Sequence, residues 1–392
     1  MRTDTDASEC GNNNADFGIY ADPLSDGSTS LTIEDAASGA LGSLETYAVT
    51  VGNPQAAAHF PGGLSHPPVG SGITSRQPVD DRYNPALRQA IDALHAGARN
   101  RVMWSAATAA ANGFTVLGCG DVSGTWNATR VFVDCASWQP VDVRLPDATD
   151  LVTTGQIEVA NNQLLYVPVA ERIYVRGCPT CNGGNLFGVR VAGEMYVNTG
   201  PEPIGSADCD NRRGPGAGGA TTNITAFVIF GSPLDVPGRA YLCQTTLYLA
   251  GESPSYTRAT DTFSFPNCTA AKPCPVSTGP PNSHVDVGGF LDWSAPNQTT
   301  SDPDNTHPLE DLALWTETSH ESQVKSGGVM LTSGVFFAPN GRMEFRSPAS
   351  GLPRNAQLVV ESFELLQGTL RLAPAPTDAV SFDSTGDAAL IR

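Results

Sequence analysis

The sequence predicts an all-β protein whose architecture is a right-handed parallel β-solenoid with a helical segment ahead of it. Two observations support this class. Between residues 113 and 200, short runs rich in β-branched and aromatic residues begin roughly every 8 to 15 residues, with no amphipathic helix between them. The chain also has 40 glycines and 30 prolines, which suits a turn-rich β protein. The runner-up is a pair of β-sandwich-like modules divided near 201–222.

Residues 1–80 are predicted to be a poorly packed or linker-like N-terminal region. They are rich in Gly, Ser, Asn and Pro and contain few consecutive apolar residues. The run at 47–51 is the strand expected within them.

The segment 81–112 is predicted to be helical. An Asn-Pro pair at 84–85 suits a helix start, and the apolar residues that follow lie on one helical stripe at Leu87, Ile91 and Leu94. We expect Gly97 to end this helix and a second helical stretch to cover about 101–111. Such a segment either shields the open end of a solenoid from edge pairing or only connects two regions, and the sequence leaves both roles open.

Residues 113–374 form the predicted β-rich solenoid domain, and 375–392 a C-terminal tail. Apolar and polar residues alternate in several runs, so that at 156–159 Ile and Val face a core while Gln and Glu face water. Loops at 201–222 and 269–283 interrupt the series. The predicted strands lie at 131–135, 141–145, 156–159, 164–167, 172–175, 187–191, 226–230, 240–243 and 246–249.

Charge limits the partners. The formal net charge is −18, from 40 acidic and 22 basic residues. This balance argues against nucleic acid, which needs a basic surface, and against docking on anionic lipid. The Gly-rich stretch 214–219 lacks the Lys-Ser/Thr ending and the helix of a phosphate-binding loop.

Nine cysteines favour an exported protein, because they are many for a reducing compartment. Eight lie in close pairs and are predicted to form disulfides, although sequence leaves their connectivity open. These pairs are Cys119 with Cys135, Cys178 with Cys181, Cys209 with Cys243, and Cys268 with Cys274. Cys10 is left over. The sequence shows neither a signal peptide nor an apolar run of membrane-spanning length, so we expect an ectodomain whose membrane anchor lies upstream of this segment.

No catalytic, cofactor-binding or metal-binding residue is predicted. Cys178 and Cys181 have thioredoxin-like spacing, but they follow a strand and precede a glycine turn, which favours a turn-stapling disulfide. We interpret the loop 299–307 as a solvated acidic loop and leave calcium binding open. A glycosidase would need two carboxylates flanking the scissile bond, and acidic residues near one another in sequence are Glu310, Asp311 and Glu317.

Three stretches of the chain carry a resemblance to a known family. They are LALWTETS at 312–319, GVFFAPNG at 334–341 and NAQLVVESFELLQGTLRLAP at 355–374. Together they look like the carboxy-terminal half of actinobacterial TadE/TadG-like proteins of the tight-adherence (Flp) pilus-assembly system. GFTVLGC at 113–119 and TRVFVDCASW at 129–138 are similar in style to what precedes that half. The resemblance covers 113–374 and is strongest after residue 311.

The resemblance implies an envelope protein with an N-terminal membrane helix, which this sequence does not contain, and a large exported β-rich part. The expected function is that of a non-catalytic, exported structural protein, extracellular or at the cell surface, associated with pilus assembly or surface adhesion. Expected partners are pilus or cell-envelope proteins, with no cofactor and no nucleic acid, and with membrane contact only through the upstream anchor. Two alternatives stay open: a carbohydrate-active β-helix enzyme, either a polysaccharide lyase or a glycosidase, and a ligand-binding adhesin.

Overall fold

The computed structural model describes the helices and strands and most of the turns between residues 85 and 346. The described residues are 19–26, 30–33, 44–45, 64–65, 73–74, 85–177, 187–200, 209, 224–250, 283–296, 309, 312–316, 318, 320–346, 356–366 and 369–372.

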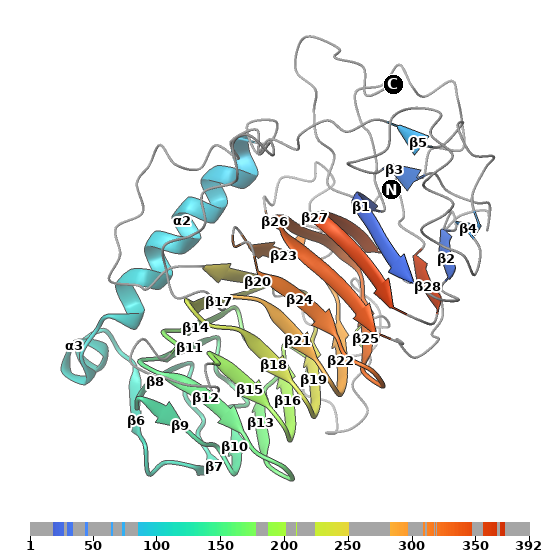
Figure 1. Ribbon diagram of the computed structural model, residues 1–392. Coiled ribbons are helices and arrows are strands. Elements are labelled where there is room, and N and C mark those ends of the chain that lie inside the picture. The colour runs from blue at the N-terminus through green and yellow to red at the C-terminus, as the bar shows by residue number, and fades with distance from the viewer. Residues whose placement is uncertain are drawn as a thin grey trace.

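The chain folds into a parallel β-helix, as the sequence predicts (Figure 1). A complete coil contributes one strand to each of three faces, which we call the first, second and third sheets. Arg130, Asp150 and Arg172 open three successive coils, 20 and 22 residues apart, and they occupy the same register position in the first sheet.

Between them, the three sheets contain the strands of six complete coils and one incomplete coil. The first sheet holds β6 (Thr115–Gly118), β8 (Arg130–Asp134), β11 (Asp150–Thr153), β14 (Arg172–Val175), β17 (Thr225–Phe230), β20 (Thr245–Ala250) and β23 (Leu312–Thr316). The second holds β9 (Ser137–Trp138), β12 (Gln156–Val159), β15 (Val189–Val191), β18 (Leu234–Val236), β21 (Val285–Val287) and β24 (Glu321–Val324). The third holds β7 (Ser123–Thr125), β10 (Asp142–Arg144), β13 (Leu164–Val167), β16 (Glu194–Val197), β19 (Arg239–Leu242), β22 (Phe290–Trp293) and β25 (Val329–Thr332).

Longer strands continue the stack and join two of the faces. β26 (Gly334–Arg346) pairs with both β23 and β24, so it spans the corner between the first and second sheets. β27 (Ala356–Leu366) pairs with β26 in parallel on both sides of that corner. The first two sheets are therefore one continuous hydrogen-bonded sheet, while the third remains separate.

Strands from the start of the chain extend the far end of this stack. β1 (Ile19–Asp26) pairs in parallel with β27, and β2 (Ser30–Ile33) lies between β28 (Thr369–Leu372) and β4 (Leu64–Ser65). β3 (Leu44–Glu45) and β5 (Ile73–Thr74) follow β1. The region 1–80 thus contributes five strands next to the last coils, whereas the predicted strand at 47–51 lies outside the described residues.

The core is a set of apolar rows inside the coils. In the first sheet, the inward row is Val131, Leu151, Ile173, Phe227, Leu247, Leu314 and Phe336, one residue from each successive strand. All seven are buried. Neighbouring strands lie about 4.8 Å apart, so each side chain covers the next, and each burial contributes about 1.5–3 kcal/mol.

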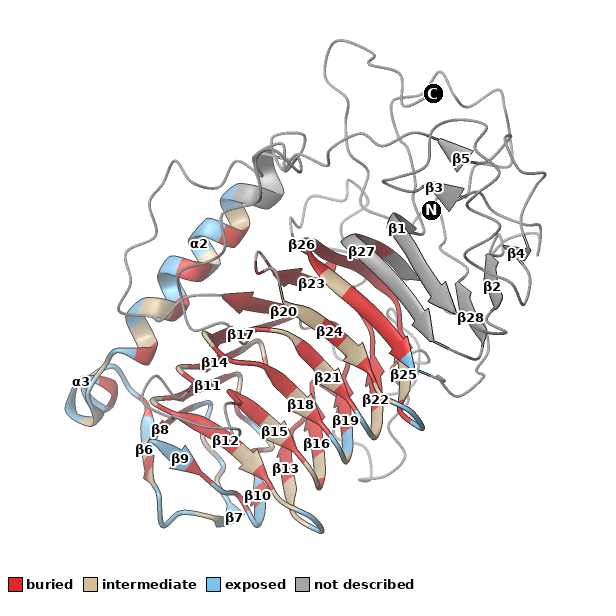
Figure 2. Cartoon of the chain, in the orientation of Figure 1, coloured by how far each residue is buried: buried red, intermediate tan, exposed pale blue. Residues whose placement is uncertain are grey.

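Two helices precede the coils, α2 (Pro85–Val102) and α3 (Ala106–Ala111). α2 lies along the outer face of the first sheet, where it contacts β11, β14 and β17 (Figure 1). Ile91, Ala98 and Val102 are buried in this contact (Figure 2). The sequence left two roles open, shielding the open end of the solenoid and merely connecting two regions. α2 has neither role, because it covers the side of the solenoid. α3 packs against β6 and β8.

The expected helix end at Gly97 is wrong. α2 continues through Gly97 to Val102. A glycine inside a helix costs about 1 kcal/mol relative to alanine. Ala98 and Val102, fully buried against the sheet, offset that cost because tertiary packing outweighs local propensity.

A buried carboxylate fastens the end of α2 to the coils. The Asp150 side chain is only 1% exposed and lies 2.8 Å from the Arg172 guanidinium. Arg101, on α2, and Arg130, on β8, both approach the same carboxylate at 3.4 Å. One acidic group therefore joins three consecutive strands to the helix.

The two-module alternative is wrong. β14 and β17 lie on either side of 201–222, yet they pair in parallel as neighbours. The same stack therefore continues across that segment. The predicted strands coincide with strands of the β-helix, whereas β6, β7, β9, β11, β16 and β18 were not predicted.

Two of the four predicted disulfides are confirmed. Cys119 is bonded to Cys135 and Cys209 to Cys243. Both bonds indicate an oxidising, extracellular environment. The other predicted cysteine pairs and Cys10 lie outside the described residues. In the part of the chain that the structure describes, no helix has the length and apolar character needed to cross a bilayer.

Candidate functional site

Three consecutive coils share a nine-residue repeat, and this repeat builds the most distinctive surface of the protein. Its copies are VRVAGEMYV at 189–197, LDVPGRAYL at 234–242 and VDVGGFLDW at 285–293. In each copy a second-sheet strand, a two-residue turn ending in glycine and a third-sheet strand follow one another. Equivalent residues of the three copies are therefore stacked from coil to coil.

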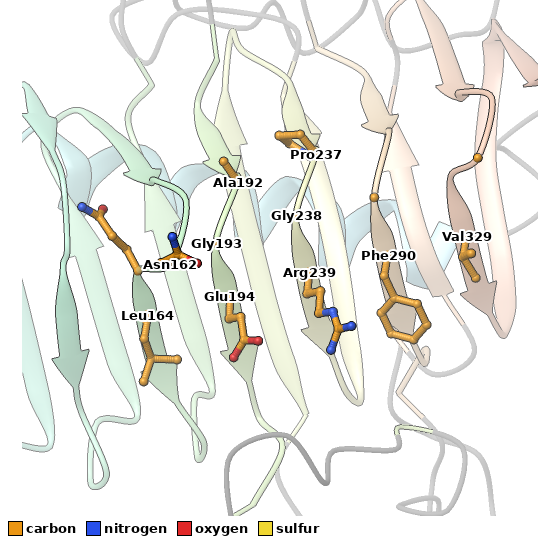
Figure 3. A pocket seen from close by; sticks show the side chains of 13 residues that line it. Asn162, Leu164, Ala192, Gly193, Glu194, Pro237, Gly238, Arg239, Phe290 and Val329 are labelled. Atoms are coloured by element: carbon orange, nitrogen blue, oxygen red, sulfur yellow. The ribbon is translucent and has the colours of Figure 1, made fainter.

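The stacked turns form the floor of a groove at the corner between the second and third sheets. The three central turns have two residues each, whereas the turns on either side, at 160–163 and 325–328, have four. Short turns between longer ones leave a hollow of about 670 Å³ (Figure 3). Asn162 and Gly327 belong to its two ends.

The glycines of this floor are required by close approach of the backbone. A Cβ on Gly289 would meet the carbonyl oxygen of Gly238, and one on Gly238 would meet that of Ala192, well inside contact distance. The coils can therefore stack this tightly only where no side chain intervenes.

One wall of the groove is a row of side chains on the third sheet. Figure 3 shows this row on neighbouring strands, and its members are Leu164, Glu194, Arg239, Phe290 and Val329. All but Arg239 are half-buried, and Arg239 is exposed. The wall thus presents apolar surface and one charge of each sign.

The two charged side chains of the wall are held in different ways. The Tyr196 hydroxyl donates a hydrogen bond to Glu194 Oε2 at 3.0 Å, which orients the carboxylate. Arg239 forms no ion pair with any described residue. Burial raises the pKa of Tyr241, an effect that the nearby Arg239 guanidinium opposes through charge and a hydrogen bond.

Beside the wall, on the same outward face of the third sheet, lies a stack of tyrosines two residues further along the strands. Tyr196 and Tyr241 are stacked with ring centroids 4.8 Å apart, and Tyr166 meets Tyr196 edge-on. All three are buried. Cys209 packs against them and is held by its disulfide to Cys243 at the end of β19, so the stack borders the wall.

A second feature is a charged row on the outer face of the second sheet. It takes one residue from each successive coil: Glu158, Arg190, Asp235, Asp286, Gln323 and Glu344. Arg190 lies 3.5 Å from Asp235 and Lys325 lies 2.8 Å from Asp286. Charges of opposite sign therefore meet along most of the row.

The pKa values of two carboxyl groups in this row are shifted in opposite directions. Asp235 and Asp286 are direct register partners on adjacent strands. Burial raises the pKa of the Asp235 carboxyl, and Arg190 opposes it only in part. Burial acts in the same sense on Asp286, but hydrogen bonds from His284 and Lys325 outweigh it and leave the Asp286 pKa lowered. Environments that separate two carboxyl pKa values are a feature of acid–base pairs.

The acidic residues that the sequence brought forward are not part of either surface as described. Glu310, Asp311, Glu317, the loop 299–307 and the pair formed by Cys178 and Cys181 all lie outside the described residues. Within the described part of the chain, no group of three or more His, Cys, Asp or Glu side chains is arranged to hold a metal ion.

Sequence reasoning missed the groove and the charged row, although a signal was present. The apolar–charged–apolar triplet at the start of each nine-residue copy marks the charged row, and the glycine two residues later marks the groove floor. Reading the strands one at a time hid this pattern, because insertions of unequal length separate the copies.

Comparison with known proteins adds no relative. No family model matches the chain, and neither a curated protein nor a solved structure is significantly similar to it.

Proposed function

We propose that this chain is a non-catalytic, exported structural protein of the cell envelope that works as a rigid body. The observation that supports this most is the continuity of the coil stack. From β6 to β27 the first-sheet strands pair in parallel without interruption. Such a stack resists bending because each coil is hydrogen-bonded and packed to its neighbours along its length.

Other features fit a protein that works outside the cytosol. The disulfides Cys119–Cys135 and Cys209–Cys243 suit an oxidising compartment. Several carboxylates of the charged row are paired with cations, Asp235 with Arg190, Asp286 with Lys325 and Glu344 with Arg342, which suits a structural surface. We extend the proposal to an association with pilus assembly or surface adhesion, which rests on the sequence resemblance alone.

Localisation and redox state test the proposal together. Intact cells that carry the gene would be treated with a maleimide–polyethylene glycol reagent after acid quenching, and the chain followed by antibody. We expect all four of these cysteines to be protected until a reductant is added, and the chain to be accessible to protease on intact cells. Reduced cysteines in a protease-protected chain would contradict the proposal.

The pilus association needs a separate measurement. Surface appendages would be sheared from cells, and the chain sought in the pilus fraction and by crosslinking to pilin. Recovery there supports the association. Its absence from both removes the pilus association but leaves envelope localisation standing.

A carbohydrate-active enzyme is the second candidate, and the Asp235–Asp286 pair favours it. The two residues are register partners on adjacent strands, which places two carboxylates side by side, as the mechanism of a retaining glycosidase requires. Asp286 Oδ1 is buried with no partner among the described residues, and the two pKa values move apart.

Polysaccharide turnover separates the two candidates. Purified chain would be incubated with a panel of neutral and uronic-acid polysaccharides, and both reducing ends and unsaturated products measured. The structural proposal expects no turnover. The enzyme would show turnover that is lost in Asp235→Asn and Asp286→Asn. The control Asp142→Asn removes an exposed carboxylate on the third sheet and would keep that turnover.

A further inference from the structure

We infer that the groove between the second and third sheets is a binding site for an extended oligosaccharide. This inference goes beyond the proposed structural role and does not depend on it. The starting point is the shape of the groove. It crosses β13, β16, β19, β22 and β25, which is four strand spacings or roughly 19 Å. A hollow of about 670 Å³ with this length suits a linear chain better than a compact ligand.

The glycine carbonyls of the groove floor are paired with backbone amides of the third-sheet strands. The amide of Phe290 donates to the Gly238 carbonyl at 2.7 Å, and that of Val329 to the Gly289 carbonyl at 2.7 Å. The amide of Arg239 donates to the Gly193 carbonyl at 2.8 Å. Because these groups are paired within the coils, a peptide cannot bind here by strand addition, which depends on unpaired main-chain groups.

Recognition must therefore come from the side chains of the wall, and their chemistry is that of a sugar site. Arg239 provides guanidinium donors that no described acidic group occupies. Glu194 provides carboxylate acceptors on the adjacent strand. Sugar hydroxyls both accept and donate hydrogen bonds, so one hydroxyl pair can satisfy both side chains.

The apolar members of the wall supply the other half of the interaction. Phe290 is half-buried next to Arg239, with its ring 5.6 Å from that of Tyr241. Its remaining surface can pack against the C–H face of a sugar ring. Leu164 and Val329 extend this apolar strip toward the two ends of the groove. Proline-rich peptides dock in grooves lined by several aromatic residues, whereas Phe290 is the single aromatic side chain among those that line this one.

The groove is also held in advance of binding. The glycine floor cannot shift without breaking the coil stacking, Glu194 is oriented by the Tyr196 hydroxyl, and Leu164 and Phe290 of the wall pack against the buried tyrosine stack beside them. A site with fixed walls loses little entropy when a ligand arrives.

Binding of defined probes tests the inference. The full chain would be titrated by calorimetry with cellohexaose, chitohexaose, laminarihexaose, mannohexaose and a galacturonic acid hexamer, and screened on a broader glycan array. We expect at least one oligosaccharide to bind. Arg239→Ala should weaken its Kd about tenfold or more, since a hydrogen bond to a charged group contributes that much. Phe290→Leu keeps apolar volume but removes the ring, and should also weaken binding.

A matched control lies on the same sheet. Arg144 is an arginine of the third sheet whose side chain is 45% exposed and pairs with Asp142 at 3.0 Å, outside the groove. Arg144→Ala should leave the Kd unchanged. Far-ultraviolet circular dichroism and thermal melts would show that each variant keeps the fold.

Several results would overturn the inference. One is that no oligosaccharide on the array or in solution binds at about 1 mM. Another is that an oligosaccharide binds but folded Arg239→Ala and Phe290→Leu retain the wild-type Kd. A third is that a proline-rich decapeptide binds in an Arg239-dependent manner while every sugar fails. None of these results bears on envelope localisation, so failure of this inference is distinguishable from failure of the proposed function.

Discussion

The first and second sheets face the same core but present opposite chemistry outward. The outward row of the first sheet is apolar and buried, and consists of Phe132, Val152, Tyr174, Val228, Tyr248, Trp315 and Phe337. The outward row of the second sheet is charged and mostly half-buried, with opposite charges paired along it. The inward rows of both sheets are mainly apolar, and their buried polar members include Thr153, Thr316 and Ser322.

This difference explains where α2 lies. An apolar outward row must be covered, and the buried stripe of α2 covers it. His95 on the helix approaches the Tyr248 hydroxyl at 3.0 Å and packs edge-on against Phe230. The inward residues therefore decide that coils form, and the outward residues decide whether a face is covered by a helix or exposed to solvent.

The largest expected effect comes from the coil stacking that both sheets share. Gly289→Ala places a Cβ against the carbonyl oxygen of Gly238, and we expect it to cost about 4 kcal/mol or more of unfolding free energy. Urea unfolding would measure it. Gly97→Ala is the control, because nothing lies near that position on α2. It should stabilise the chain by about 0.5–1 kcal/mol. Equal, small effects at both glycines would show that the floor is not tightly stacked.

The next largest loss of stability is expected from a substitution that disturbs only the packing of α2 on the first sheet. Ile91→Ala removes a fully buried side chain from the α2 interface and should cost about 2–5 kcal/mol. Gln89→Ala, on an exposed position of the same helix, should stay within about 0.5 kcal/mol of wild type. Chemical denaturation gives both values. If Ile91→Ala costs no more than Gln89→Ala, α2 does not contribute to the stability of the fold.

A smaller loss of unfolding free energy is expected when one carboxylate on each sheet is replaced, and the two losses can be compared. Asp150→Asn on the first sheet leaves three arginines without their shared, 1% exposed partner, and should cost about 2 kcal/mol. Asp286→Asn on the second sheet loses a pair with Lys325, whose side chain is 45% exposed, and should cost about 1 kcal/mol or less. Raising the salt concentration should reduce the second cost more than the first. The reverse order of costs would contradict the contrast drawn between the sheets.

The smallest effect is a pH dependence on the second-sheet side. Burial, and then the charge of His284, lowers the pKa of His320 below its ordinary value of 6.5. The unfolded chain therefore binds this proton more readily than the folded chain. The stability contributed by neutral His320 is full above pH 6.5 and is lost as the pH falls from there through the folded pKa.

Melting temperatures between about pH 7.5 and about pH 5.5 test this sign. His320→Gln should lose less stability on acidification than the wild type across that range. Parallel curves for the two proteins would show that His320 does not contribute to the pH dependence.

The strands themselves were predictable because their signal is local. In β12, Ile157 and Val159 are buried as the alternation predicts, whereas Gln156 is also buried, contrary to the expectation that it faces water, and its amide donates to the Ser137 hydroxyl. The cysteine pairs that the structure describes were also predictable, since Cys119 and Cys135 flank one short hairpin-length segment.

The candidate site was not predictable in the same way. Glu194, Arg239 and Phe290 are far apart in sequence and unlike in type, and they share only their position after the glycine of the nine-residue repeat. Their adjacency arises from the register of β16, β19 and β22. The long segments between these strands differ in length, which conceals the common spacing.

By itself, the sequence determined that this protein is built of short strands around an apolar interior, because side-chain alternation with a period of two acts within a few residues. Only the tertiary structure decided which strands became neighbours, that α2 continued through Gly97, and that β1 joined β27. It also decided that two-residue turns stacked between four-residue turns leave a groove. Each of these outcomes depends on contacts between residues distant in the chain, and their free energy enters only when the coils are packed together.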